Sequence, residues 1–137
     1  MTNVVQVYDY RFSTTDWPIM RFQVRVSEIA QSLGFEVESW QEDGLGQAYG
    51  MLLKLPTGRV VLLRELQHGI DHFGEKGPHV CVDAAVVAEF GVEHLIDEVL
   101  TSLGLSEQTV DWRGSSETQK SATDFAKWAT AYRKQNE

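Results

Sequence analysis

Apolar residues near the N-terminus recur at intervals of three or four, which is the period of a helix that buries one face. The residues on this face are Ile19, Phe22, Val26, Ile29, Ala30 and Leu33. Hydroxyl and carboxylate side chains at residues 13–16 and Pro18 suit a first helical turn, and Gly34 suits a C-terminal stop. We therefore predict a helix over about residues 16–33, preceded at residues 3–11 by a strand or an ordered arm.

The middle of the chain alternates apolar and polar residues, which is the period of a strand with one buried face. We expect one strand at residues 35–38 and a return strand at residues 49–55, joined through a two-residue hairpin turn at Asp43-Gly44. The segment Leu-Pro-Thr-Gly-Arg at residues 55–59 predicts a second tight turn, because Pro presets φ and Gly accepts a left-handed backbone.

Residues 60–63 are apolar without alternation, which favours a central strand covered on both faces or a strand packed in a homodimer. Residues 67–78 have the composition of a polar loop that carries glycines and histidines. After this loop, residues 79–83 form the expected fourth strand.

The last third of the chain returns to a helical period. A first helix is expected to end at Gly104 and to bury Val92, Leu95, Ile96, Val99 and Leu103. Residues 107–113 predict a short strand or a tight connection. A final helix begins near residues 115–116, with Trp128 outside its inner stripe of Ala122, Phe125, Ala126, Ala129 and Tyr132.

The order of these elements predicts an α+β fold, with an antiparallel meander of three to four strands, an N-terminal helix and two C-terminal helices. The length of 137 residues fits a single domain over residues 1–137. The single Cys81 excludes an internal disulfide and suits a reducing compartment. Because the chain shows neither a signal-peptide pattern nor an apolar run of membrane-spanning length, we expect a soluble, cytoplasmic protein without a membrane partner.

Charge narrows the possible functions. Twenty acidic residues against twelve Lys and Arg give a net charge of −8, which argues against a nucleic-acid partner because phosphate binding needs an excess of cations. Residues 77–112 contain no Lys or Arg but hold seven acids: Asp83, Glu89, Glu93, Asp97, Glu98, Glu107 and Asp111. Glu93 and Asp97 lie four residues apart and share a helix face, which Glu89 extends if that helix begins early enough.

This acidic stretch has two interpretations, a solvated face that aids solubility or a face that attracts a basic partner. The electrostatic field of a face that attracts its partner raises association rates by a factor of roughly 10–10³. Small, acidic, cysteine-poor α+β chains resemble bacterial immunity proteins, which neutralise a cognate toxin that is often a basic nuclease. The resemblance rests on length, net charge and residues 77–112. It implies a non-enzymatic protein without a cofactor that covers a toxin's active site, and we expect the seven carboxylates to contact Lys or Arg of that partner.

Three of the four histidines lie within twelve residues and suggest an alternative function. His68, His72 and His79, together with Cys81, supply imidazole and thiolate groups of the kind that bind zinc. The alternative is therefore a small metal-binding protein or a metal-dependent enzyme. Two features weigh against it: glycines near His68 and His72 disfavour a helical spacing, and Cys81 between two valines also fits a small core residue.

Overall fold

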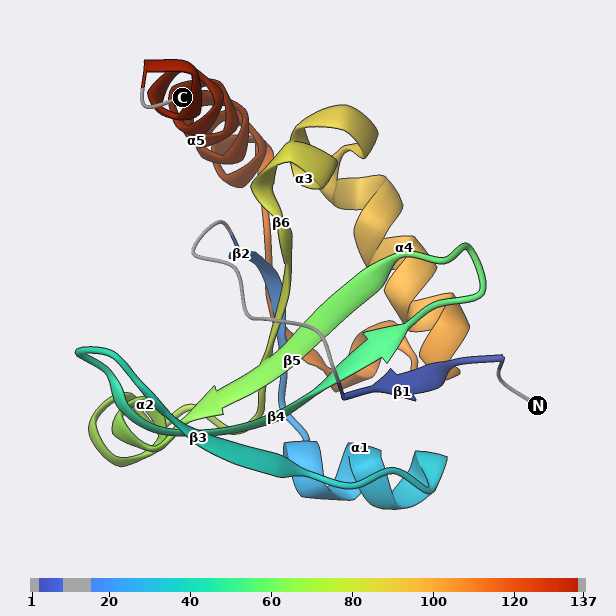
Figure 1. The fold of residues 1–137 in the computed structure, drawn as a ribbon. Coiled ribbons are helices and arrows are strands. Elements are labelled where there is room, and N and C mark those ends of the chain that lie inside the picture. Colours follow the sequence, from blue (N-terminus) through green and yellow to red (C-terminus); the bar gives the residue numbers. More distant parts are fainter. Residues whose placement is uncertain (1–2, 9–15, 136–137) are drawn as a thin grey trace.

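The computed structural model describes residues 3–8 and 16–135, which form an α+β structure around one antiparallel sheet (Figure 1). Its strands are β1 (Val5–Val7), β2 (Asp16–Phe22), β3 (Glu38–Glu42), β4 (Gly46–Lys54), β5 (Val60–Leu66), β6 (His79–Asp83) and β7 (Val110–Arg113). Its helices are α1 (Val26–Leu33), α2 (Gln67–Phe73), α3 (Ala84–Phe90), α4 (Val92–Leu103), α5 (Ser116–Gln135) and the short 3-10 helix η1 (Glu107–Thr109). The α+β class is confirmed, but the described part of the chain has seven strands, and three α-helices follow β6 instead of two.

The strand order β1-β4-β5-β6-β2-β7 places the N-terminal β2 between two strands from the second half of the chain. Strand β2 pairs with β6 from Asp16 opposite Asp83 to Arg21 opposite His79. On its other edge it pairs with β7, where Arg21 lies opposite Trp112. At the far side of the sheet, β3 and β1 pair in turn with the first and last parts of β4.

Side chains from both faces of the sheet are buried. Helices α1, α3 and α4 and part of α5 form the main core with one face, where fully buried residues include Ile19, Phe22, Met51, Leu95 and Ile96. Because side chains alternate along a strand, Leu62 and Cys81 project from the opposite face, where they join Leu52 in a second buried cluster. Strand β5 is therefore central and buried on both faces, as residues 60–63 predicted.

The predicted helix over residues 16–33 is wrong in its first half, where residues 16–22 form strand β2. Ile19 and Phe22 imitate a helical spacing because they lie three residues apart, yet both are buried in the sheet. A bulge near Pro18 shifts the register of β2 against β6 and removes the regular alternation that would have revealed a strand. Pairing with distant strands therefore overrides the local pattern.

Helix α1 begins at Val26 and ends at Gly34, whose left-handed backbone (φ 74°) is the stop expected from the sequence. Its first turn is capped from a distance, because the Val26 N–H donates to Glu65 Oε1 on β5 at 2.6 Å. Burial raises the pKa of Glu65, while this hydrogen bond and the nearby Arg25 lower it. The capping side chains predicted at residues 13–15 lie outside the described residues.

The turns of the strand region follow the sequence with small shifts. The strand expected at residues 35–38 begins instead at Glu38. In the hairpin between β3 and β4 the Leu45 N–H donates to the Glu42 carbonyl, so the loop holds three residues and not two. The second turn contains Gly58 at φ 90°, as the sequence predicted.

The predicted loop over residues 67–78 is wrong in its first half, because residues 67–73 form helix α2. Gly69 lies inside this helix, where a side chain would collide with the carboxylate of Glu75. Gly74 then ends the helix with a left-handed backbone (φ 64°). The glycines thus serve packing and termination and do not prevent a helix.

Most of the remaining elements are confirmed. Helix α4 ends at Gly104, residues 107–113 contain the short strand β7, and α5 begins at Ser116. Tyr132, expected in the inner stripe of α5, is instead exposed. Strand β1 lies within the predicted segment 3–11, whose last residues are outside the described ones. No helix in the described ranges combines the length and apolar composition needed to cross a bilayer.

Gly50 in the middle of β4 provides a test of this packing. A methyl group there would overlap the Leu63 carbonyl and touch the Trp40 ring. We expect Gly50→Ala to lower the free energy of unfolding by about 3 kcal/mol, because a rigid backbone cannot make room for it. The control is Gly44→Ala, which meets open space and loses about 1 kcal/mol through its left-handed backbone. Urea denaturation measures both, and equal losses would contradict the close approach of β4 and β5.

Candidate functional site

The seven carboxylates expected to bind a partner come from neighbouring elements, but not all of them face solvent. Among the described residues, arginines from outside residues 77–112 pair with five of the seven. These arginines are Arg21 on β2, Arg59 before β5 and Arg113 at the end of β7. The lack of bases within this stretch of sequence is therefore compensated in space, and the pairs differ in burial and in how many carboxylates share one arginine.

Glu98 is largely buried and pairs with residues next to β5. Its side chain is 10% exposed, and both carboxylate oxygens accept from Arg59 Nε at 3.0–3.1 Å, while Thr57 Oγ1 donates to Oε1 at 2.5 Å. Burial raises the pKa of Glu98, but the hydrogen bonds from Arg59 and Thr57 outweigh it and lower the pKa overall. This pair attaches the β4–β5 turn to α4, so Glu98, predicted as a contact residue, has a structural role within the fold.

Asp111 belongs to a second network on the sheet face opposite the main core. Arg21 donates to Asp111 at 2.8 Å and to Glu75 at 3.1 Å, and His79 Nε2 lies 3.7 Å from the same Glu75 oxygen. Burial lowers the pKa of His79, as do Arg21 and Arg64, while Glu75 and Asp111 act in the opposite direction. The network joins β2, β6 and β7 and thereby holds Asp111 in a structural role.

Two other predicted residues mark the ends of α3. Asp83 caps the start of this helix, because its carboxylate accepts from the Ala85 N–H at 2.9 Å. Glu89 is exposed near the end of α3. The helical row from Glu89 to Glu93 does not form, because Gly91 (φ 90°) separates α3 from α4.

The remaining three carboxylates gather around one guanidinium, and we call this group the Arg113 cluster. Arg113 lies 2.6 Å from Glu93, 2.6 Å from Glu107 and 3.7 Å from Asp97. The three carboxylate side chains are 67–72% exposed, and Arg113 is 29% exposed. Hydrogen bonding from Arg113 lowers the pKa of Glu93. Three negative charges around one positive charge leave two carboxylate charges uncompensated at this exposed surface.

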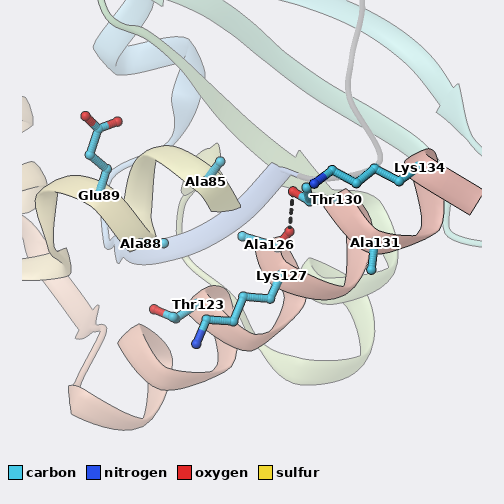
Figure 2. A pocket seen from close by; sticks show the side chains of 9 residues that line it. All are labelled: Ala85, Ala88, Glu89, Thr123, Ala126, Lys127, Thr130, Ala131 and Lys134. Carbon is cyan, nitrogen blue, oxygen red and sulfur yellow. Dashed lines mark hydrogen bonds between the residues drawn. The ribbon is translucent and has the colours of Figure 1, made fainter.

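An apolar groove of about 600 Å³ lies between α3 and α5 (Figure 2). Ala85 and Ala88 line it from α3, and small residues of α5 line the other wall. Lys127 and Lys134 on α5 also border the groove. The groove thus combines a wall of small residues with charged groups of both signs, because Glu89 on α3 also lines it.

Exposed aromatic side chains continue along α5. Trp128 is 59% exposed and stacks on Tyr132 with ring centroids 5.4 Å apart. Phe125 connects this pair to Trp17 on the sheet, at 5.7 Å from Trp128 and 5.2 Å from Trp17. The position of Trp128 outside the inner stripe was expected from the sequence, and exposed aromatic residues of this kind are common at protein interfaces.

The structure does not assemble the metal site predicted from His68, His72, His79 and Cys81. The first two histidines lie on α2, whereas His79 pairs with Glu75. Cys81 is buried, and burial raises the pKa of its thiol to about 12, which is typical of a small core residue. No three His, Cys, Asp or Glu side chains in the described part of the chain are grouped to hold a metal.

Comparison with protein families, curated proteins and solved structures finds no match for this chain. The charge of the chain and the geometry of its side chains are therefore the basis for its function. Sequence reasoning missed the part played by Arg113, although this residue directly follows the base-free stretch. It also missed the groove, because α3 was not predicted as a separate helix.

His79 gives a prediction about acid stability. Its pKa is lowered in the folded protein, so the unfolded chain binds more protons as pH falls below the ordinary histidine value of about 6.5. The free energy of unfolding should therefore decrease from pH 7 toward pH 5, and His79→Gln should make this decrease shallower. His94→Gln, which alters an exposed imidazole, is the control. Denaturant titrations across this range measure the slope, and an unchanged slope in His79→Gln contradicts the assignment.

Proposed function

We propose that this protein is a non-enzymatic binding protein of the immunity type, which neutralises a basic toxin such as a nuclease by covering its active site. The observation that carries the proposal is the surplus of two exposed carboxylates in the Arg113 cluster, on a chain with a net charge of −8. The partner's Lys or Arg side chains supply the cations that the cluster lacks.

The Arg113 cluster is suited to exchange its partners. Exposed ion pairs contribute only about 0–1 kcal/mol to stability, so a carboxylate loses little when it turns from Arg113 to an incoming cation. Charges arranged in this way mainly increase the association rate and the specificity of a complex.

The contact residues are accordingly fewer than the sequence suggested. Glu93, Asp97 and Glu107 form the contact surface. Glu89 instead lines the groove between α3 and α5. The remaining three carboxylates serve the fold, through capping of α3 or pairing with partly buried arginines: Asp83, Glu98 and Asp111.

The two alternatives have less support. A metal-dependent enzyme that uses all four predicted ligands lacks the necessary grouping of side chains among the described residues. The homodimer was suggested by the doubly apolar residues 60–63, but these contribute to buried clusters on both faces of the sheet within one chain. That pattern therefore no longer argues for a second copy.

The test uses the product of the reading frame next to this protein's gene as the partner. We expect the triple variant Glu93→Gln, Asp97→Asn, Glu107→Gln to slow its association by about tenfold and to flatten the salt dependence of the rate. The control variant, Glu28→Gln, Glu36→Gln, Asp43→Asn, removes the same charge from exposed residues elsewhere. Stopped-flow or surface-binding kinetics at low and high salt measure both. Equal effects of the two variants on the association rate, or the absence of any complex, would contradict the proposal.

Arg113→Gln separates recognition from stability. Removal of the guanidinium leaves three carboxylates in mutual repulsion and should lower the free energy of unfolding by about 1 kcal/mol at low salt. The same change makes the surface more negative, so the association rate with a basic partner should stay equal or rise. A marked loss of association in this variant would assign the contact to Arg113 instead of to the carboxylates.

A further inference from the structure

Helix α2 and the β3–β4 hairpin border a cleft of about 430 Å³. Figure 1 shows α2 beside the tip of this hairpin. His68 and His72 line the cleft from α2, together with Asp71, and Gln47 lines it from β4. Both histidines are exposed, and their ring centroids lie 4.5 Å apart.

The spacing of this pair follows from the helix. Residues four apart on a helix share a face, and α2 places His68 and His72 in this relation despite the glycine between them. Two imidazoles that bind one tetrahedral ion through bonds of about 2.0–2.1 Å hold their ring centres roughly 5 Å apart. The observed separation of 4.5 Å is slightly below this value, and both side chains are exposed, so a small rotation of the two side chains brings both rings to one ion.

The geometry points to a site for a divalent transition-metal ion of the Zn²⁺ class, held by His68 and His72 in the cleft between α2 and the β3–β4 hairpin. Imidazole nitrogen suits Zn²⁺, Ni²⁺ and Cu²⁺, whereas Mg²⁺ and Ca²⁺ require oxygen ligands. The site excludes His79 and Cys81, which lie on β6. It is also separate from the Arg113 cluster and does not depend on the function proposed above.

A metal ion held by only these two histidines has open coordination positions. Because no third His, Cys, Asp or Glu of the described residues is grouped with the pair, water or a donor atom of a bound molecule completes the coordination. A closed structural site, by contrast, takes all four of its ligands from the protein. The cleft is large enough to admit a small ligand beside the ion.

The ion also stabilises α2. This helix has seven residues, contains Gly69 and lacks a side-chain cap at its start, so its intrinsic stability is low. An ion that bridges His68 and His72 connects successive turns of the helix. Metal binding and the order of α2 are therefore coupled.

The test is a titration of the full, untagged and chelator-treated chain with Zn²⁺, followed by calorimetry and by the thermal unfolding midpoint. We expect one ion per chain and a midpoint that rises with Zn²⁺ but not with Mg²⁺. His68→Gln and His72→Gln should each abolish the Zn²⁺-dependent rise while they keep the midpoint measured in chelator. His94→Gln, which removes an exposed histidine elsewhere, should behave as the unaltered chain.

A variant with altered histidine spacing distinguishes this site from nonspecific binding of Zn²⁺ to exposed histidines. The double change His72→Gln, Phe73→His keeps two histidines on α2 but places them five residues apart, where they no longer share a face. It should lose the Zn²⁺-dependent rise. If it binds Zn²⁺ as the unaltered chain does, or if the unaltered chain shows no saturable binding, the inference is wrong.

Discussion

The antiparallel pairing of β2 with both β6 and β7 is the constraint on which the rest of the structure depends. It places a segment from the start of the chain between two strands from its second half, with Ile19, Met20 and Phe22 fully buried. The same pairing brings Arg21 to Asp111 and aligns β7 so that its last residue, Arg113, lies beside α4. Without β2 in this position, neither the second charged network nor the Arg113 cluster would be assembled.

The charges of the acidic stretch divide according to burial. The carboxylate of Glu98 is largely withdrawn from solvent, and removal of either partner from its pair with Arg59 leaves a poorly hydrated charge, which is costly. The carboxylates around Arg113 remain hydrated, so their pairs are weak and exchangeable. One stretch of sequence therefore contains carboxylates that hold the fold together and exposed carboxylates, to which we assign the proposed recognition role.

Sequence reasoning succeeded where local chemistry decides the conformation. Helix α4 with its glycine stop, the turn at residues 55–59 and the exposed position of Trp128 follow from period, backbone freedom and helical geometry. It failed at residues 16–22, because a bulged strand between two others carries a spacing that resembles a helix. It failed again at α2, where a glycine that normally weakens a helix makes room for Glu75.

The candidate site shows the same division. The sequence by itself determined, through its charges, that the protein is acidic and that residues 77–112 lack Lys and Arg, and, through its hydrophobic periods, that the chain forms an α+β fold. The tertiary structure alone decided which carboxylates remain exposed and which histidines come together, because arginines distant in sequence neutralise some acids and α2 brings His68 onto one face with His72. Charge along a chain is a one-dimensional property, whereas pairing depends on distances that only strand order and helix packing set.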